Sequence, residues 1–545
     1  MLKIRTATLA LLCVCACALI LPAGFTPTPT RAAAPPPVIR EAPPAPEFTE
    51  EERHAELRSR RERVLAKLGP NSLLVLFSAE PRVYTNDVDY EFRQENNLYY
   101  LTALRQQGAT LVLVRGAAGP AREILFLPRR SAAAETWTGH MYSPEEARAA
   151  SGLGEIWDAR EFEPFIKAAR SRLNHRPAPE AVLLSPPNAA PVLSEDFLAA
   201  MSKNEATLYL LLIGGERNQE FRREHAYAAA WAGNSGGLSV RSAGEVFAAM
   251  RQRKSPYELR LMQHAVDISI EGHQRAQAVA SRAKWEYEVE AELDYTYRRR
   301  NADNWGYPSI VGCGPNATTL HYEESQGRVS PGDLLLIDAA AEYDHYSADV
   351  TRTFPVSGKF TPAQAEVYNI VLAAQEAAFR AIKPGARLSD VHHAAAEVIK
   401  DGLLRLGLIT ERNSLAQNRV WFMHGTSHWL GMNVHDVSAR GDDSLDAGMV
   451  FTVEPGIYVR PDALDNLPKT PENEKFVAAV RPAFQKYRGI GVRIEDDVVV
   501  TADGYHNLSA ALPRTIADIE AFIARAQKEV RVGLLPPWRP NAAGE

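Results

Sequence analysis

Short apolar runs alternate with helical stretches over much of the first half of the chain. An amphipathic pattern over residues 50–68 predicts a helix, because Gly69 and Pro70 follow as a stop signal. Four short apolar runs are typical of buried strands, and they lie at 73–77, 110–114, 124–127 and 208–213. Buried strands interleaved with helices indicate an α/β domain. We therefore predict an N-terminal α/β domain over residues 50–235.

A second pattern begins near residue 250. Ser255-Pro-Tyr-Glu258 is a capping box with proline at the first helical position, and it predicts a helical region reaching about Arg300. Thr361-Pro-Ala-Gln364 begins another helix in the same way, and a third helix is predicted over 389–406. Strand-like runs lie between and after these helices. The pattern predicts a second domain of mixed α/β (α+β) class over 250–525.

The first 23 residues have the pattern of an export signal. A basic start is followed by an apolar run over 7–21, which Pro22 breaks and which is too short for a membrane span. Cleavage is expected after Ala23, with a later site at 32–34 as an alternative. Lipoprotein processing at Cys17 is a second alternative. We expect a secreted or periplasmic protein without a stable membrane span after processing.

Two further segments have no pattern of a folded core. Residues 24–49 are rich in Pro, Ala and Thr, which predicts an extended linker. Residues 526–545 are predicted to form a loose tail. The stretch 460–486 is also predicted to be irregular, and one interpretation is a lid that alters the preferred substrate length.

Composition narrows the functional classes. The chain has 545 residues, enough for two to three domains, and its net charge of −6 gives no basic stripe for binding phosphates. Nucleic acid is therefore excluded as a partner. Only Cys313 lies beyond the predicted signal, so the mature chain cannot form an intramolecular disulfide.

Two aspartates lie on neighbouring apolar segments. The segments 334–338 and 347–354 indicate two strands joined by a polar turn at 342–345. A hairpin would bring Asp338 and Asp349 close enough to share a site. An ionised aspartate ending an apolar run is costly without a cation or hydrogen bonds. The alternative for either residue is a turn cap.

Three histidines lie within twelve residues, in a chain that holds only 14: His424, His428 and His435. Unrelated core or surface roles are a poor explanation for such a cluster. Gly425 and the small residues after it argue against a helical repeat. A loop or bent strand, with the backbone close to a ligand, is the better prediction.

Carboxylates also end the later strands. Glu454 follows the apolar run 449–453, and the alternation over 491–500 places Arg493, Glu495 and Asp497 on one strand face. An arginine there can hold carboxylates or ligand oxygens in a bidentate way. For Asp497 the alternative is a solvated strand face.

Five of these residues form an oxygen-rich set of candidate metal ligands: Asp338, Asp349, His428, Glu454 and Glu495. Four carboxylates and one imidazole suit hard or borderline divalent ions such as manganese, and a carboxylate can bridge two ions. Such a pair can make hydroxide from water near neutral pH and stabilise an oxyanion beside it. This chemistry is typical of amide hydrolysis.

Several ordered motifs resemble those of Xaa-Pro aminopeptidase (aminopeptidase P), a "pita-bread" dinuclear metallopeptidase family. Besides Asp338 and Asp349, the motifs are Leu320-His-Tyr322, Phe422-Met-His-Gly-Thr-Ser-His-Trp-Leu-Gly431, Val434-His-Asp-Val437, Glu454-Pro-Gly-Ile-Tyr458 and Gly489-Ile-Gly-Val-Arg-Ile-Glu-Asp-Asp497. Tyr90–Thr102 and Ala134–Gly139 are similar to the family's non-catalytic N-terminal domain. The resemblance covers about residues 50–525 and implies a pita-bread catalytic domain after the N-terminal domain.

The resemblance also implies a role for each ligand. Asp338 would chelate one ion, and His428 and Glu454 the other. Asp349 and Glu495 would bridge the two ions, which makes two divalent ions per chain, expected to be Mn²⁺. Glu454 would also accept a proton from the nucleophilic water.

Other residues are implied to act on the substrate. His321, His424 and His435 would bind substrate and steady the tetrahedral intermediate. Arg493 and Tyr458 would support the bridging site and the bound oxygen. Trp137 would reach the active site of a neighbouring subunit, which implies a homo-oligomer, a dimer or a tetramer.

The implied function is release of the N-terminal residue from peptides with proline second, by attack of a metal-bridging hydroxide on the Xaa-Pro bond. An Xaa-Pro dipeptidase is the alternative within the same class. A non-catalytic peptide-binding member of the fold is a third reading, which the complete set of five ligands disfavours.

Overall fold

The protein is described here from a computed structural model, which covers residues 38–187, 189, 191–215, 218–231, 236–439 and 444–529. The predicted export signal over 1–23, the linker up to residue 37 and the tail from residue 530 lie outside the described residues. The first four residues of the predicted tail, 526–529, are wrong as a loose tail, because they end a helix and Ala526 is buried in the core. Within the described part of the chain, no helix combines the length and apolarity needed to cross a bilayer.

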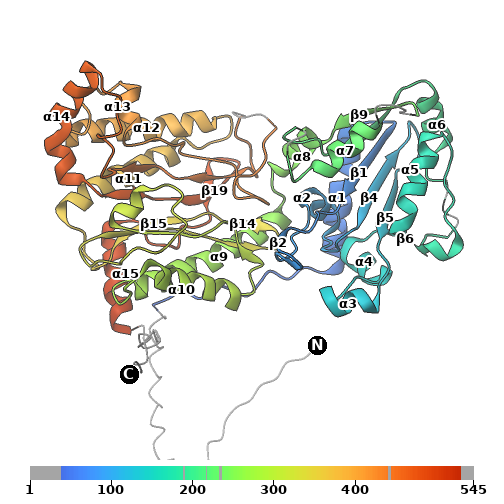
Figure 1. Cartoon of the computed structure of the whole chain (residues 1–545), viewed down its shortest axis with the longest axis horizontal. Coiled ribbons are helices and arrows are strands. Elements are labelled where there is room, and N and C mark those ends of the chain that lie inside the picture. Colours follow the sequence, from blue (N-terminus) through green and yellow to red (C-terminus); the bar gives the residue numbers. More distant parts are fainter. Residues whose placement is uncertain are drawn as a thin grey trace, which may run out of the picture. The chain divides into compact units, whose positions relative to one another are not determined.

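A seven-stranded sheet forms the N-terminal domain, in the order β7-β6-β5-β4-β1-β8-β9 (Figure 1). The strands are β1 (Ser72–Phe77), β4 (Thr110–Arg115), β5 (Arg122–Leu127), β6 (Ile156–Asp158), β7 (Val182–Leu184), β8 (Ala206–Leu210) and β9 (Leu238–Ser242). Both faces of the sheet are buried, because Leu74 and Leu76 pack into one apolar cluster while Leu73, Val75 and Phe77 pack into another. The runs 73–77, 110–114 and 124–127 are therefore confirmed as buried strands, whereas the run 208–213 is a strand only as far as Leu210, where β8 ends.

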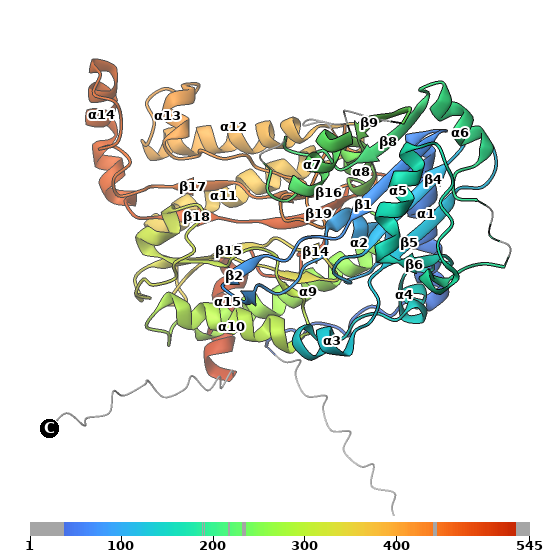
Figure 2. The same ribbon diagram turned by 45° about the vertical axis from the view of Figure 1, so that its right-hand side comes forward.

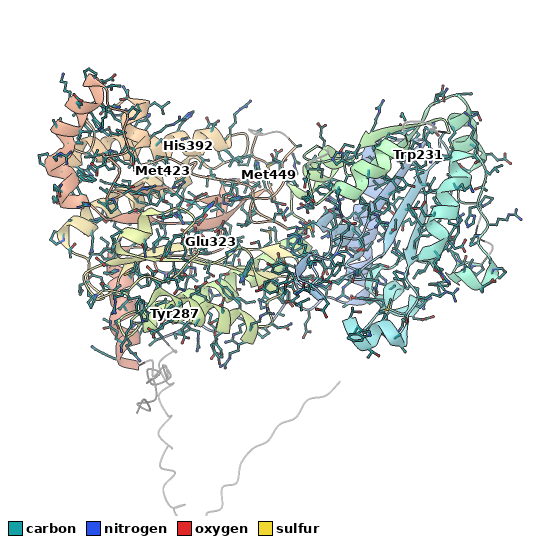
Figure 3. All side chains as sticks on the ribbon, viewed as in Figure 1. Trp231, Tyr287, Glu323, His392, Met423 and Met449 are labelled. Atoms are coloured by element: carbon teal, nitrogen blue, oxygen red, sulfur yellow. The ribbon has the colours of Figure 1, made fainter. Side chains whose placement is uncertain are left out.

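Helices cover both faces of this sheet. One cluster includes residues of α1 (Glu50–Leu68), α2 (Asn96–Thr102), α4 (Pro144–Ser151) and α8 (Gly244–Arg251). The other includes residues of α5 (Phe162–Arg170), α6 (Glu195–Ser202) and α7 (Arg222–Trp231), with Trp231 buried among them (Figure 3). The domain also contains α3 (Ala132–Thr138), which has no buried residue, and a separate exposed hairpin of β2 (Val83–Thr85) and β3 (Val88–Asp89).

The C-terminal domain places small antiparallel sheets between two pairs of helices (Figures 1 and 2). One pair is α9 (Pro256–Val279) and α10 (Glu286–Arg299), and the other is α11 (Pro362–Ala381) and α12 (Leu388–Leu406). The strands are β10 (Asn304–Trp305), β11 (Ile310–Cys313), β12 (Leu334–Asp338), β13 (Ala341–Tyr343), β14 (Tyr346–Ser347), β15 (Thr351–Pro355), β16 (Val450–Val453), β17 (Gly456–Tyr458), β18 (Gly491–Arg493), β19 (Asp496–Val500) and β20 (Tyr505–Asn507). The remaining helices are α13 (Leu415–Arg419), α14 (Pro471–Tyr487) and α15 (Ile516–Glu529).

The capping boxes begin their helices as predicted. Ser255 and Glu258 cap α9, and Thr361 and Gln364 cap α11, in each case with side chain and backbone bonded reciprocally. The helical region expected to reach Arg300 is divided, however. A turn separates α9 from α10, and the Glu288 side chain accepts from the backbone N–H of Trp285 at the new start (3.2 Å).

Two segments differ from the sequence expectation. Residues 38–49 are assigned to the linker, yet Val38 and Ala42 are buried in the core of the C-terminal domain. The cause is a polar match, since the backbone N–H of Ala42 donates to Glu271 Oε2 of α9 at 2.8 Å. The stretch 460–486 is irregular only over 460–470, where Leu464 is nevertheless buried in the core. From Pro471 on it is the helix α14, whose Val480 and Phe484 are buried, so the stretch packs on the core.

Candidate functional site

All but two of the predicted site residues line one cavity of about 340 Å³ in the C-terminal domain. They are Asp338, Asp349, His428, Glu454, Glu495, His321, His424, His435 and Arg493. Tyr458 lies beneath the cavity, fully buried, with its hydroxyl 2.8 Å from His424 Nε2. Trp137 is absent from the lining and is 88% exposed on α3. Glu323, which sequence reasoning did not select, also lines the cavity (Figure 3).

The predicted hairpin brings two of the carboxylates together. Strand β12 pairs antiparallel with β15, so that Asp338 stands opposite Thr351. The turn is carried by β13 and β14, where Glu342 pairs with Ser347. Each side of the hairpin is therefore divided into two short strands, β12 and β13 on one side and β14 and β15 on the other. Asp349 lies in the gap between β14 and β15. This gap lets its side chain enter the cavity beside Asp338.

Glu454 and Glu495 reach the cavity from later segments of the chain. Glu454 follows β16, and its backbone N–H donates to Thr426 O at 2.8 Å, which ties it to the histidine segment. That segment contains no helix between His424 and His428, as predicted. The single strand expected over 491–500 is wrong. Strands β18 and β19 pair with different partners, β17 and β16, and Glu495 lies at the switch between them.

Asp497 is not on a solvated strand face. The residue is fully buried, and its Oδ2 accepts a hydrogen bond from the backbone N–H of Asp349 at 3.0 Å. Burial, followed by the charge of Asp349, raises the pKa of Asp497 well above its ordinary value. Its role is therefore to fix the backbone of a candidate ligand, which pattern alone did not show.

The ligand atoms are close enough to share cations. His428 Nε2 lies 3.2 Å from Asp349 Oδ2 and 3.6 Å from Glu454 Oε1. One ligand atom each from Asp349, His428 and Glu495 lie within 4.8 Å of one another. Buried carboxylates at this spacing repel one another unless a cation or protons lie between them.

The pKa shifts report this crowding. Burial, and then the charge of Asp338, raises the pKa of Asp349 well above its ordinary value. Burial, and then Glu495, raises the pKa of Glu454 to about 8. Burial also acts to raise the pKa of Asp338, but Arg493 and Tyr307 outweigh it and the net shift is downward. An uncompensated cluster of acids of this kind fits divalent cations, so the residues present match the predicted centre.

Tyr307 is a site residue that sequence reasoning missed. Its hydroxyl lies 2.5 Å from Asp338 Oδ1 and 2.6 Å from Asp349 Oδ1, so it joins the two aspartates. Tyr307 precedes β11, whose pairing with β12 places Ile310 opposite Asp338. No motif spacing marks it, because only this strand pairing brings it to the site.

A polar chain links the cavity floor to His424. Arg493 donates through Nη2 to Asp338 Oδ2 at 2.5 Å and through Nη1 to Tyr458 Oη at 2.8 Å. Burial, and then the nearby Arg493, lowers the pKa of His424 to about 4. His424 is therefore a neutral imidazole near pH 7. His435 lies on the other side of the site, with its ring edge-to-face against His428 at 4.4 Å between centroids.

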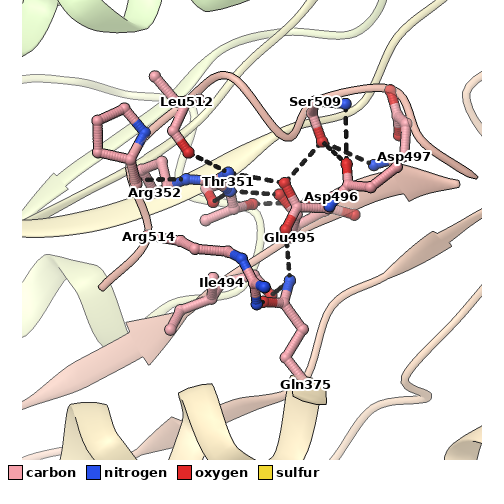
Figure 4. A network of polar contacts seen from close by, with 12 residues as sticks. Thr351, Arg352, Gln375, Ile494, Glu495, Asp496, Asp497, Ser509, Leu512 and Arg514 are labelled. Atoms are coloured by element: carbon pink, nitrogen blue, oxygen red, sulfur yellow. Dashed lines mark hydrogen bonds and ion pairs between the residues drawn. The ribbon is translucent and has the colours of Figure 1, made fainter. Parts of the chain in front are cut away.

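A buried ion pair joins β15 and β19, the strands that begin just after Asp349 and Glu495 (Figure 4). Arg352 and Asp496 are both fully buried and lie 2.7 Å apart. Arg352 also donates to Glu495 O at 2.6 Å, and Ser509 and Gln375 donate to the Asp496 carboxylate. The pair therefore ties β15 to β19 directly behind the cavity.

Replacing Arg352 by alanine is expected to lower the free energy of unfolding by about 3–5 kcal/mol, because Asp496 is left buried without its cation. Chemical denaturation of the purified protein measures this loss. Arg222→Ala is a matched control, since Arg222 pairs with Glu80 at 2.8 Å and both side chains are at least half exposed. A surface pair contributes at most about 1 kcal/mol. Equal losses for the two variants would contradict the interpretation.

Comparisons with known proteins agree with this arrangement. Residues 260–502 match the model of metallopeptidase family M24, and residues 57–175 match the aminopeptidase P N-terminal domain. The Xaa-Pro aminopeptidase of Escherichia coli (strain K12) is 33% identical over 495 residues, which cover 87% of this chain and 98% of that protein.

Solved structures agree as well. A structure of aminopeptidase P from E. coli with the inhibitor Pro-Leu has a TM-score of 0.72 and 31% identity, covering 89% of this chain and 100% of that one. Proline aminopeptidase P II from Yersinia pestis has a TM-score of 0.70 and 32% identity, covering 88% and 100%. The predicted order of an N-terminal α/β domain and a pita-bread domain is confirmed. The chain belongs to the Xaa-Pro aminopeptidase family, whose catalytic domain is that of metallopeptidase family M24.

Proposed function

We propose that this protein is a metal-dependent exopeptidase that releases the N-terminal residue from peptides with proline in second position. The observation that carries the proposal is the single cavity in which five metal-binding side chains face three histidines. The similarity to curated Xaa-Pro aminopeptidases over nearly their whole length supports the substrate class.

We propose two divalent ions per chain, held by Asp338, Asp349, His428, Glu454 and Glu495. Bound ions of this kind polarise a carbonyl oxygen and make water a nucleophile at neutral pH. Oxygen donors with a single imidazole favour manganese over softer metals, so Mn²⁺ is the proposed native ion.

The chain's own residues provide proton transfer and positioning. The pKa of Glu454, raised to about 8 before any cation binds, shows how strongly its surroundings disfavour an isolated negative charge. Glu454 is proposed to accept a proton from the attacking water, since its carboxylate lines the cavity and its Oε1 lies 3.6 Å from the candidate ligand His428. Tyr458, held by Arg493, and the backbone oxygen of Gly425 occupy both ring nitrogens of His424 and fix that imidazole in the substrate cavity. His321 and His435 are the histidines proposed to donate to the substrate oxygen.

An Xaa-Pro dipeptidase is the competing activity. Pro-Leu is the dipeptide that an aminopeptidase would leave after removing the first residue of Xaa-Pro-Leu, whereas a dipeptidase would release free amino acids. The similar E. coli structure holds Pro-Leu as an inhibitor, which favours the aminopeptidase. A non-catalytic binding role has no supporting feature in the cavity, because all five ligands are in place.

Matched tripeptides test the proposal. With added Mn²⁺, we expect kcat/KM for Xaa-Pro-Xaa to exceed that for Xaa-Ala-Xaa by about 10²-fold or more. The reason is that an apolar pocket binds the proline ring more tightly in the transition state than it binds the methyl group of alanine. The proline nitrogen has no N–H, so the site has to select it by shape. Equal rates for proline and alanine would refute the selectivity, and cleavage of the Xaa-Pro dipeptide alone would establish the dipeptidase.

We further propose a dimer or tetramer in which Trp137 contacts the cavity of a neighbouring subunit. Its 88% exposure and its absence from the lining of its own cavity support this. Sedimentation analysis of the wild type measures the assembly.

We also propose export to the periplasm or medium, on the basis of the basic and apolar pattern over 1–23. N-terminal sequencing of the mature protein tests it, and an intact Met1 would reject it.

A further inference from the structure

The loop that carries His435 is held by side chains of the N-terminal domain. We name residues 431–436 the His435 loop. Arg93 Nη2 donates to the backbone oxygen of Met432 at 2.7 Å. Asn96 Nδ2 donates to Asn433 Oδ1 at 2.8 Å. Arg93 lies three residues before Asn96, the first residue of α2, within a sequence motif for which the proposed function gives no role.

Arg251, the last residue of α8, and Lys254, between α8 and α9, reach the far end of the loop. The side chain of Asp436 is fully buried and pairs with Arg251 Nη2 at 2.6 Å and with Lys254 Nζ at 3.4 Å. The second arm of Arg251, Nη1, donates to Asn97 Oδ1 of α2 at 3.0 Å. The buried guanidinium of Arg251 therefore joins α2 to Asp436, the residue that follows His435.

Space around this end of the loop is also restricted. A Cβ on Gly431 would lie 2.1 Å from Asp436 Oδ2, so a larger residue there would displace the carboxylate. Backbone bonds inside the catalytic domain hold the loop base, from Ser347 N to Gly431 O and from Asp436 N to Trp429 O. The side-chain contacts to the loop come from Arg93 at Met432, from Asn96 at Asn433, and from Arg251 and Lys254 at Asp436.

None of these contacts touches a candidate metal ligand. Their effect converges on His435, whose ring packs on His428 and faces the cavity. Catalytic groups act within tight limits, and a displacement of about 1 Å can cost about 10²-fold in rate.

We propose that Asn96 and Arg251, with Arg93, are positioning residues for His435, so that the N-terminal domain takes part in turnover through this clamp. The proposal rests on the proposed function and on the role of His435 in it. It assigns to the N-terminal domain an effect on turnover within the same chain, separate from the proposed contact of Trp137 with a neighbouring subunit.

The test is a pair of variants measured for steady-state kinetics and metal content. Asn96→Ala removes the contact with Asn433 of the loop. Arg251→Lys keeps the positive charge beside Asp436 but loses the hydrogen bond to Asn97. Each is expected to lower kcat about 10-fold or more with little change in KM and with metal content unchanged. Arg105→Ala is the matched control, because Arg105 joins Asp303 across the same two domains at 2.8 Å but touches no residue of the loop.

A double-mutant cycle separates positioning from general loosening. In a His435→Ala background, Asn96→Ala is expected to have no further effect on kcat, since the group it positions is gone. An undiminished loss in that background, or an equal loss in Arg105→Ala, would overturn the proposal. Failure of the wild type to cleave Xaa-Pro-Xaa peptides would instead reject the proposed function, so the two failures are distinguishable.

Discussion

Replacing Asp349 by alanine is expected to lower kcat/KM by about 10³-fold or more and to reduce the bound metal. Asp349 is the proposed shared ligand, and its carboxylate lies 3.2 Å from His428 and 2.6 Å from the Tyr307 hydroxyl. A metal centre supplies several kcal/mol of transition-state stabilisation, and each 1.36 kcal/mol is a factor of ten in rate. Both ions lose a common anion in this variant, so neither is held as in the wild type.

The measurement is metal content per chain by elemental analysis, alongside kinetics on an Xaa-Pro-Xaa peptide. Glu323→Gln is a matched control, because Glu323 is a carboxylate of the same cavity outside the ligand set. That control is expected to keep the wild-type metal content. Full activity in Asp349→Ala, or a metal-free wild type that cleaves at the normal rate, would rule out the ligand assignment.

The second large effect separates two neighbouring histidines. His428→Ala is expected to lose metal, because its Nε2 is within 3.6 Å of carboxylate oxygens of both Asp349 and Glu454. His435→Ala is expected to keep its metal and to lose kcat by about 10²–10³-fold, the effect of removing one oxyanion donor. The only ring contact of His435 within the described residues is with His428.

Metal content of the two variants decides between the roles. If His435→Ala loses metal as fully as His428→Ala, the substrate-side role of His435 is wrong. If His428→Ala keeps both ions and fails only in turnover, the two residues have been exchanged. Circular dichroism of each variant checks that the fold is retained.

Strand ends were predictable because they depend on local pattern. Asp338 and Glu454 each end an apolar run, and an ionisable residue at that place is unfavourable unless something compensates it. The hairpin was predictable for the same reason, since a polar turn separates two apolar segments. Asp349 lies in a break between strands, however, and no pattern along the chain marks that break.

Contacts between distant segments were not predictable from pattern. Tyr307 joins Asp338 and Asp349 because β11 pairs with β12, and Asp497 is buried because its carboxylate accepts from the backbone of Asp349. The segment 491–500 alternates as one strand would, yet it divides at Glu495 between two sheets. Alternation reports which residues share a face, but pairing partners are chosen elsewhere in the chain.

The sequence by itself determined the domain order, the capped helices and the chemical types gathered at the site. These follow from hydrophobic period, capping residues and ordered motifs, which act over a few residues. Three features were decided only by the tertiary structure. Arg352 and Asp496 join β15 to β19 behind the cavity, residues 38–49 pack on α9, and α2 contacts the His435 loop. Those features depend on burial and on contacts between residues that are hundreds of positions apart in the sequence. These contacts stabilise the protein only after folding has brought the distant segments together and excluded water from them.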